Sequence, residues 1–371
     1  MKIVINALSA RLGGGQTYLK NLLAYLPDSP DLEIVVFAPA YLKLPEDRRI
    51  RRDETGWPTE NPLLRTVWEK LLLPGLLRRE KADVLFCPGG VVATRVPRDC
   101  KVVTMFRNMI PFDPEVLARM PPGLQKLRNV ILRRVMLRSM SNADLTIFIS
   151  DYARKIIEGL TTVRHAVTIP HGINEVFRTH HKSLDRPEWL PHEEYILYVS
   201  KFDVYKHHRE VALAYASLPA ALRARYKLVL VGETEEQLTG EVMKLIEERQ
   251  LKDEIIVAGP RAYEDLPAAY RNATVNLFAS SCENCPNILL EALGAGRAVL
   301  SSSIPPMPEF GADGAGYFAP TDPGSIRQAM EKVLLDEHYR SDLATASARR
   351  SETFNWRLTS TRTWQSIGAL V

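Results

Sequence analysis

The sequence SCENCPNILLEALGAG, residues 281–296, contains a short helix with recognisable ends. Pro286 suits the first helical position, because its missing N–H would be unpaired there and its φ angle is already helical. Isoleucine and leucine follow at helical spacing, and glycine ends the pattern at Gly294 or Gly296. The stretch therefore predicts a helix that begins directly after a polar loop.

Two carboxylates flank the start of this expected helix. Glu283 lies in the loop before the helix, and Glu291 lies in its second turn. The first N–H groups of a helix lack partners within it and lie at the positive end of its dipole, so they form an anion site. Carboxylates can accept hydrogen bonds from sugar hydroxyls while the helix end binds phosphate. The combination is suited to a nucleotide-sugar.

The length and composition of the chain indicate a globular enzyme of two domains. Its 371 residues are too many for one ordinary core and fit two domains of roughly 150–200 residues each. Apolar residues make up 46% and charged residues 25%, which argues against disorder. Four cysteines in so long a chain do not form a disulfide framework, which points to a reducing cytoplasm. Residues 1–16 predict a buried strand rather than a signal peptide, and no run of about 18 apolar residues predicts a membrane span.

Positive charge is concentrated in the first half of the chain. Residues 1–177 carry 26 Lys and Arg against 18 Asp and Glu, whereas residues 178–371 carry 22 against 26. Two clusters contribute most to this difference: Arg48, Arg49, Arg51 and Arg52, and Arg128, Arg133, Arg134 and Arg138. They favour contact with an anionic membrane surface or a phosphate-bearing acceptor, although solvated helix faces give the same pattern. No aromatic residues are interleaved with them, which disfavours nucleic acid.

Apolar strand-like runs alternate with helical patterns along the whole chain. The expected strands are 2–8, 32–38, 83–87, 101–106, 144–150 and 166–170, followed by 195–200, 227–232, 254–259, 274–280, 298–303 and 316–320. Helical patterns lie between them, for example at 16–26, 63–79, 124–139, 209–217, 235–249 and 325–335. This alternation predicts an α/β protein with two Rossmann-like, doubly wound parallel sheets facing a central cleft.

The two series of strands define the expected domains. Residues 1–177 form the first domain and residues 194–355 the second, joined by a polar, proline-punctuated linker at 178–193. A last helix is expected at 356–371. Ligands of such sheets bind beyond the carboxyl ends of the strands.

With these segments in place, the chain resembles the retaining glycosyltransferases of family GT4 (glycosyltransferase group 1), which have the GT-B fold. The strongest element is the Glu-x7-Glu motif formed by Glu283 and Glu291. Further family-like segments follow in the right order: GGGQTYLKNLL (13–23), ISDYARKII (149–157), IPHGINEVF (169–177), KFDVYKHH (201–208), LVLVG (228–232), 263–270 and PEFGADGAGYFAPTD (308–322). The resemblance implies that the helix at 356–371 packs back on the first domain.

The resemblance also implies roles for residues of the second domain. Glu291 would accept hydrogen bonds from the ribose hydroxyls, and Glu283 would contact the transferred sugar and stabilise oxocarbenium charge. Lys206 would neutralise the diphosphate leaving group as a compact point charge. The donor-binding set is completed by Lys201, which stands where many relatives have Arg, by Asn287 and Ile288 at the helix start, and by Glu309.

In the first domain, a glycine-rich loop and an asparagine are candidates for contact with the ligand. Gly13, Gly14 and Gly15 follow the first strand without the full spacing of a dinucleotide fingerprint, and the resemblance places Gly14 and Gly15 beside the donor phosphates. Many relatives carry a catalytic-site histidine after the strand at 101–106, and Asn108 is the candidate for that position here. Asparagine cannot act as a general base, which suits a mechanism without one.

Neither metal nor cofactor is expected. Cys282 and Cys285 form a C-x-x-C pair, but the other two cysteines, Cys87 and Cys100, lie in the other domain, so the thiols are expected to pack rather than bind zinc. The chain contains no Asp-x-Asp sequence. His171 lies at the domain junction and is expected to be structural.

Together these features predict a retaining, metal-independent glycosyltransferase that is cytoplasmic, with possible contact at the inner face of the membrane. Its donor is a UDP- or GDP-sugar and its acceptor a glycan or lipid-linked glycan, as in assembly of a bacterial surface polysaccharide. Two alternatives remain open: a GT-B nucleotide-sugar epimerase, which would want acid/base groups in the cleft, and a nucleotide-binding interaction protein without transfer activity.

Overall fold

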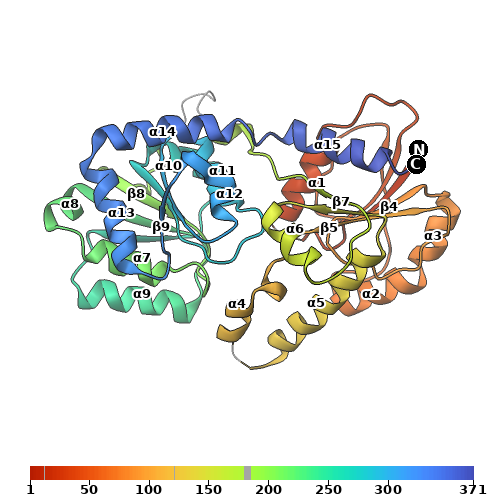
Figure 1. Ribbon diagram of the computed structural model, residues 1–371, viewed down its shortest axis with the longest axis horizontal. Helices are drawn as coiled ribbons and strands as arrows, with labels where there is room; N and C mark the ends of the chain where they lie inside the picture. The colour runs from red at the N-terminus through yellow and green to blue at the C-terminus, as the bar shows by residue number, and fades with distance from the viewer. Residues whose placement is uncertain (12, 121, 179–184) are drawn as a thin grey trace. The chain divides into compact units, whose positions relative to one another are not determined.

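The computed structural model describes residues 1–11, 13–120, 122–178 and 185–371, which form two compact units (Figure 1). Unit 1 contains Met1–Gly172 and Trp356–Val371, and unit 2 contains Ile173–Asn355. Each unit is built on one parallel sheet with helices packed against it. The expected fold class, two Rossmann-like parallel-sheet domains, is therefore confirmed.

The sheet of unit 1 has seven strands in the order β3-β2-β1-β4-β5-β6-β7. Its strands are β1 (Lys2–Asn6), β2 (Glu33–Phe37), β3 (Ile50–Arg52), β4 (Val84–Cys87), β5 (Lys101–Phe106), β6 (Leu145–Phe148) and β7 (Ala166–Thr168). The strand order reverses direction between β1 and β4. That reversal is the switch point at which ligands of doubly wound sheets bind.

Helices cover the sheet of unit 1, with α1 and α15 on one side and α2 and α3 on the other (Figure 1). They are α1 (Gly14–Ala24), α2 (Pro62–Leu71), α3 (Leu73–Glu80), η1 (Ile110–Phe112), α4 (Pro114–Arg119), α5 (Leu124–Asn142), α6 (Asp151–Glu158) and α15 (Trp356–Gly368). Trp68 of α2 packs edge-on against Phe37 of β2, with 5.0 Å between ring centroids. Burial of such apolar side chains is the main favourable contribution to the fold.

The sheet of unit 2 has six strands in the order β10-β9-β8-β11-β12-β13. Its strands are β8 (Glu194–Val199), β9 (Tyr226–Val231), β10 (Ile255–Gly259), β11 (Val275–Phe278), β12 (Ala298–Ser302) and β13 (Gly316–Phe318). The order matches that of the dinucleotide-binding fold, and its switch point lies between β8 and β11.

Helices also lie on both sides of the second sheet, with α10 and α11 opposite α7 and α9 (Figure 1). They are η2 (Glu175–Phe177), α7 (His208–Ala216), α8 (Ala220–Arg225), α9 (Glu236–Glu248), η3 (Tyr263–Asp265), α10 (Leu266–Asn272), α11 (Asn287–Gly294), α12 (Met307–Gly311), η4 (Ala312–Gly314), α13 (Pro323–Leu335) and α14 (Glu337–Ser351). None of the helices in the described ranges is long and apolar enough to cross a membrane.

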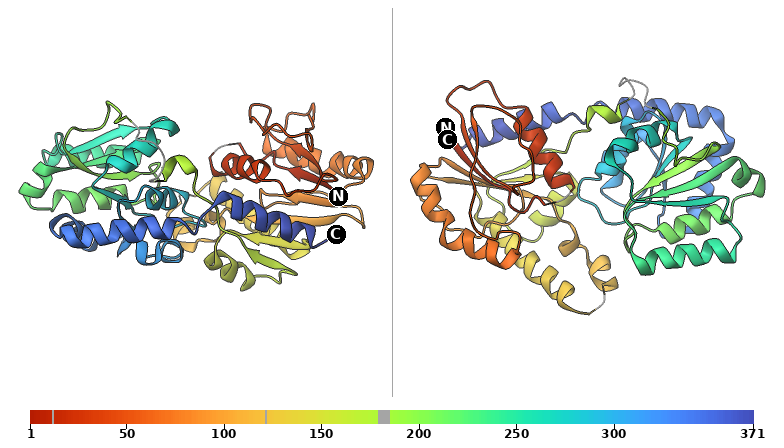
Figure 2. Two further views of the ribbon diagram at one scale, coloured as in Figure 1. Left: turned by 90° about the horizontal axis from the view of Figure 1, so that it is seen from above. Right: turned by 180° about the vertical axis from the view of Figure 1, so that it is seen from behind.

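The C-terminal helix α15 packs on α1 within unit 1, and the two helices lie side by side in both views of Figure 2. Trp364 Nε1 donates a hydrogen bond to the carbonyl oxygen of Leu22 at 3.1 Å. His171 is 2% exposed and packs against the rings of both Tyr18 and Trp356, at centroid distances of 5.5 and 5.3 Å. Its surroundings are those of a packed core residue.

The segment expected as a linker, 178–193, belongs instead to unit 2. Residues 179–184 lie outside the described ranges, but the Arg178 side chain is buried, and its guanidinium donates hydrogen bonds to the carbonyl oxygens of Ser351 and Phe354. The unit therefore begins at Ile173, before the expected boundary. The polar composition of 178–193 predicted a linker. The burial of Arg178 against main-chain carbonyl groups could not be predicted, because such contacts leave no pattern in the sequence.

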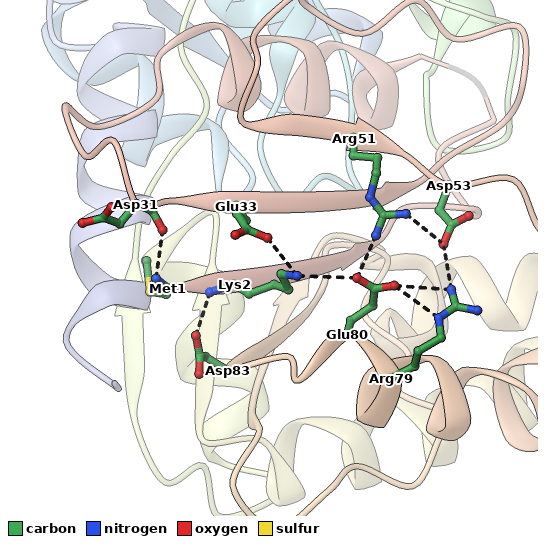
Figure 3. Close-up of polar contacts among 9 residues, drawn as sticks. All are labelled: Met1, Lys2, Asp31, Glu33, Arg51, Asp53, Arg79, Glu80 and Asp83. Carbon is green, nitrogen blue, oxygen red and sulfur yellow. Dashed lines mark hydrogen bonds and ion pairs between the residues drawn. The ribbon is translucent and has the colours of Figure 1, made fainter.

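Three arginines of the first cluster have ion-pair or hydrogen-bond partners within unit 1. Two of them, Arg51 and Arg52, lie in the short edge strand β3, which the sequence did not predict. Arg49 pairs with Asp47 at 2.7 Å, and Arg52 donates to the carbonyl oxygens of residues 40 and 42. Arg51 pairs with Glu80 of α3 at 2.7 Å, in a network that also includes Lys2, Glu33, Asp53 and Arg79 (Figure 3).

Candidate functional site

The carboxyl edge of the second sheet carries most of the expected site residues. The loop after β8 contains Lys201 and Lys206, and the loop after β11 contains Glu283. β8 and β11 are hydrogen-bonded neighbours, pairing Ile196 with Val275. Because parallel strands end at the same edge of a sheet, both loops lie at the switch point.

Lys206 and Glu283 form an ion pair at this edge. The Nζ atom of Lys206 contacts Oε1 of Glu283, and the two side chains are 6% and 17% exposed. Ser280 donates a hydrogen bond to the same carboxylate oxygen at 2.8 Å. The Lys206 ammonium also lies 5.0 Å from the centre of the Phe278 ring and 5.3 Å from that of Tyr205. The lysine is therefore fixed in place, as a buried charge requires.

Lys201 differs from Lys206 in its exposure and its partner. Its side chain is 50% exposed and pairs with Asp203 at 2.8 Å. Its ammonium lies 5.7 Å from the centre of the Tyr205 ring, the same ring that Lys206 approaches. The structure thus places two ammonium groups around one aromatic side chain, and of the two only that of Lys206 is buried.

Helix α11 begins one residue later than expected. Pro286 is the N-cap residue rather than the first helical residue, and Asn287 begins the helix. No side chain caps this end, and Asn287 and Ile288 are only partly buried. The Asn287 N–H donates to the carbonyl oxygen of Cys285 at 2.9 Å. An uncapped, accessible helix start is a site where the helix dipole attracts an anion.

Glu291 lies in the second turn of α11, as expected, and contacts two tyrosines. Tyr263 donates a hydrogen bond from its hydroxyl to Oε1 of Glu291 at 3.1 Å. Burial raises the pKa of Glu291 to about 7, and the hydroxyls of Tyr263 and Tyr270 oppose that rise. A carboxylate in this position retains further lone pairs for an incoming donor. It can therefore bind a pair of neighbouring hydroxyl groups.

Glu309 lies on a separate loop after β12, within the short helix α12. Arg350 of α14 holds this helix by donating to the carbonyl oxygens of Glu309 and Phe310 at 2.7 and 2.8 Å. The main chain at Glu309 is therefore anchored at the carboxyl edge of the same sheet.

In unit 1, the glycine-rich loop meets the loop after β5. Helix α1 begins at Gly14, two residues before the expected start, with Gly13 as N-cap at φ +57°. A Cβ atom added to Gly15 would lie 3.3 Å from Nη1 of Arg107, so the glycine permits this approach. Asn108 uses its side-chain oxygen to accept a hydrogen bond from the Ile110 N–H at 3.2 Å. Its carboxamide nitrogen is the group left to donate to a ligand.

Sequence reasoning missed three residues that shape the site of unit 2. Tyr263 and Ser280 hydrogen-bond the two motif carboxylates, and Tyr205 lies beside both lysines. Tyr263 opens one of the family-like segments, which is the one signal that could have singled it out. Cys282 and Cys285 are 4% and 8% exposed and pack in the core of this unit.

Comparison with known proteins matches both halves of the chain to glycosyltransferase families. Residues 182–350 match the profile "Glycosyl transferases group 1", and residues 12–177 match "Glycosyltransferase Family 4". The serotype-specific mannosyltransferase WbdA of Escherichia coli is 28% identical over 228 residues, covering 59% of this chain and 28% of WbdA. The chain thus spans a little more than a quarter of that relative.

Two further proteins extend this comparison. The O-antigen chain mannosyltransferase B of Escherichia coli is 26% identical over 238 residues, covering 61% of this chain and 60% of the relative. The crystal structure of Anabaena HepE in complex with UDP-glucose superposes over 100% of both chains, with a TM-score of 0.72 and 15% identity, which shows a shared fold. On its sequence matches and its two parallel-sheet units, the chain belongs to the group 1 glycosyltransferases of the GT4 type.

Proposed function

We propose that this protein transfers a sugar from a nucleoside-diphosphate-sugar to an acceptor hydroxyl, with retention of the anomeric configuration. The observation that carries the proposal is the ion pair between the buried Lys206 and the partly buried Glu283 at the switch point of unit 2. It places one fixed cation and one carboxylate on the edge that also carries the open start of α11. Phosphate and sugar hydroxyls are the groups that such a set binds.

In this mechanism, the leaving diphosphate is stabilised where its charge develops. The ammonium of Lys206 and the N–H groups at the start of α11, around Asn287 and Ile288, are oriented before the reaction, so they need no reorganisation. Lys201 adds a second ammonium at the edge of the site, and Gly14 and Gly15 let the donor phosphates approach the main chain of unit 1. These groups supply the leaving-group stabilisation without a requirement for a divalent metal or another cofactor.

The two motif carboxylates have different roles. Glu291 accepts hydrogen bonds from the ribose hydroxyls of the donor, and Glu283 contacts the transferred sugar and stabilises positive charge at its anomeric carbon. When a diphosphate binds, it competes with Glu283 for the ammonium of Lys206. Glu283 then loses its ion pair with Lys206 and can contact the sugar, while it keeps its hydrogen bond from the Ser280 hydroxyl. The main chain at Glu309 borders the sugar from the neighbouring loop.

Retention follows from a reaction on one face of the sugar. The bond between the anomeric carbon and the phosphate oxygen breaks, and the acceptor oxygen bonds to the same face. The departing phosphate oxygen takes the acceptor proton, so no protein base is required. Asn108 can orient a hydroxyl through its amide nitrogen but cannot remove a proton. This absence of a base at Asn108 also disfavours an epimerase, which needs acid/base groups.

The names of the similar proteins narrow the substrates we propose. Two are mannosyltransferases of Escherichia coli, one of them assigned to the O-antigen chain, and one structure holds UDP-glucose. We therefore propose a UDP- or GDP-hexose as donor and a glycan or lipid-linked glycan as acceptor, in assembly of a bacterial surface polysaccharide. The reaction would take place in the cytoplasm.

A panel of UDP- and GDP-sugars tests this function. Each is incubated with the purified protein, with and without an oligosaccharide acceptor, and the nucleoside diphosphate and sugar nucleotide are quantified. Transfer predicts acceptor-dependent release of the nucleoside diphosphate and a product with the donor's anomeric configuration by proton NMR. An altered sugar nucleotide without release would identify an epimerase, and binding without either would identify a binding protein.

An exposed apolar face on unit 1 supports peripheral contact with an anionic membrane. On α2 and the start of α3 the exposed apolar residues are Leu63, Leu64, Val67, Leu71 and Leu72, and on α5 they are Leu124, Leu127, Val130, Ile131 and Val135. Helix α5 carries five Lys and Arg and no acidic residue. Anionic lipid headgroups complement that charge, and the leucines suit the acyl boundary.

Replacing Leu124, Leu127 and Ile131 together by serine should weaken binding to phosphatidylglycerol vesicles by about tenfold or more, because each exposed leucine loses its transfer into the bilayer. Vesicle co-sedimentation measures this, and the matched control is Leu335→Ser, a leucine 70% exposed on α13. If the natural protein bound neutral phosphatidylcholine vesicles as tightly as phosphatidylglycerol vesicles, the proposed attraction between the basic residues of α5 and anionic headgroups would be wrong. Concentration-dependent dimerisation without vesicle binding would assign the face to a second copy of the chain.

A further inference from the structure

Tyr263 is the side chain that joins Glu291 to the beginning of unit 2. Its hydroxyl donates to Oε1 of Glu291 at 3.1 Å and accepts a hydrogen bond from Nδ2 of Asn174 at 2.9 Å. Asn174 follows Ile173, the first residue of the unit. A single hydroxyl therefore bridges the ribose-binding candidate to a segment more than a hundred residues earlier.

The ring of Tyr263 is held so that its hydroxyl points at this carboxylate. It packs edge-on against Phe177, with 5.3 Å between ring centroids, and Phe177 is fully buried. The segment 173–177 also packs on α11, because a Cβ atom added to Gly294 would lie 3.1 Å from the Ile173 side chain and 3.2 Å from the Phe177 carbonyl oxygen. Tyr263 and Glu291 are thus both fixed against the same short segment.

We infer that Tyr263, oriented by Asn174, is a positioning residue that holds the Glu291 carboxylate ionised and correctly turned for the ribose hydroxyls of the nucleotide. The inference rests on the proposed function, in which Glu291 binds ribose. In this role Tyr263 does not need to contact the reacting sugar. Its action is exerted through the hydrogen bond to Oε1.

The bond to Tyr263 and the bonds to ribose can coexist. A carboxylate has about four lone-pair directions on two oxygens, and Tyr263 occupies one of them. Tyr263 is 42% exposed, so a ligand can reach this residue. Hydrogen bonds to an ionised acceptor are roughly twice as strong as neutral ones. Loss of this one bond therefore affects both the charge and the orientation of the carboxylate.

The charge on Glu291 is the quantity that Tyr263 controls. Burial raises the pKa of Glu291 to about 7, and the hydroxyls of Tyr263 and Tyr270 are the groups that lower it. Burial raises the pKa of Tyr263 far above its usual range, so it stays a donor at neutral pH. The nearby carboxylate Glu175 is paired with Arg178 at 3.2 Å. Burial thus opposes ionisation of Glu291 near neutral pH, and the two tyrosine hydroxyls favour it.

The test is the pH dependence of nucleotide binding, measured with UDP and GDP by calorimetry between pH 6 and pH 9. In the natural protein, affinity should fall as the pH decreases through about 7, because Glu291 becomes protonated. In Tyr263→Phe the fall should begin at higher pH, with an affinity about tenfold lower at pH 7 and a smaller difference at pH 9. Asn174→Ala should shift the profile in the same direction by less.

Tyr195→Phe is the matched control. Tyr195 is buried, and its hydroxyl donates at 2.7 Å to the carbonyl oxygen of Ala269 in α10 rather than to a carboxylate. Its loss should leave the profile in place. The phosphates of the ligand titrate alike with every variant, so only the differences between variants count.

The outcomes separate this inference from the proposed function. If the natural protein binds UDP or GDP and Tyr263→Phe shows the same profile, the positioning role is wrong and the site assignment stands. A uniform loss of affinity across the pH range would show that the ring only shapes the site, which also overturns the inference. If neither UDP nor GDP binds, the proposed function fails and this inference fails with it.

Discussion

Replacing Lys206 by methionine should reduce the rate of sugar transfer by about 10²–10³-fold, because removal of one oriented electrostatic group from the transition state has that effect in other enzymes. The ammonium is the one buried cation that the described residues place beside Glu283 at the switch point. Methionine fills the space against the rings of Phe278 and Tyr205 without a charge. Single-turnover assays with the identified donor measure the chemical step directly.

Loss of stability has to be separated from loss of chemistry in this variant. Glu283 is 17% exposed, so removing its partner leaves a poorly solvated carboxylate, with a cost of about 3 kcal/mol. The double variant Lys206→Met with Glu283→Gln should recover the melting temperature and remain inactive. Lys227→Met is the matched control, since Lys227 is 12% exposed, pairs with Glu193 and is the second residue of β9, at the opposite sheet edge. Transfer at an undiminished rate by Lys206→Met would contradict the leaving-group role.

Replacing Glu291 by glutamine should weaken nucleotide binding and at the same time stabilise the unliganded protein at alkaline pH. Glutamine keeps the shape of the side chain, but its amide presents one acceptor oxygen instead of two. Affinity for UDP or GDP should fall by about tenfold to a hundredfold, since charged hydrogen bonds to both ribose hydroxyls are weakened. Calorimetry at pH 8, where Glu291 is ionised, gives the comparison.

The stability effect follows from the raised pKa of Glu291, about 7, compared with 4.5 for an exposed carboxyl. The folded state keeps the proton that the unfolded chain releases as the pH rises through 4.5. Stability therefore decreases between about pH 4.5 and 7, and the full loss is present above 7. Glutamine removes this destabilising contribution, which is on the order of 3 kcal/mol.

Thermal unfolding at several pH values measures this effect. The melting temperature of Glu291→Gln should equal that of the natural protein near pH 4.5 and exceed it increasingly up to about pH 8. A substitution that lowers ligand affinity while raising stability is typical of a binding residue held in an unfavourable environment. Equal melting temperatures at pH 8 would show that Glu291 is solvated in the folded protein.

The sheets of both units were predictable from the sequence, because strands buried on both faces form continuous apolar runs such as 195–200 and 227–232. β3 was missed because an edge strand needs no apolar run, and its residues Arg51 and Arg52 read as a solvent-facing cluster. The unit boundary was placed too late for a related reason. Arg178 is buried because it donates hydrogen bonds to the carbonyl groups of residues 351 and 354. These residues are far away in the sequence, so no local pattern predicts the contact.

The sequence predicted where the two motif carboxylates lie along the chain, with Glu283 in the loop before a helix and Glu291 in the second turn of that helix, and the structure shows this local arrangement. The partners of these residues were not predictable. That Lys206 pairs with Glu283 follows from the adjacency of β8 and β11, strands far apart in the chain. The contact of Tyr263 with Glu291 joins two further loops in the same way. Sequence identifies residue types at a site, and topology decides which of them touch.

A structure of the protein bound to UDP or GDP tests the central claim most directly. The account predicts the diphosphate within hydrogen-bond distance of Lys206 Nζ and the start of α11, with both ribose hydroxyls on Glu291 and Glu283 no longer paired with Lys206. A nucleotide bound elsewhere, for example only at Gly13–Gly15 of unit 1, with Lys206 and Glu283 still paired, would contradict it.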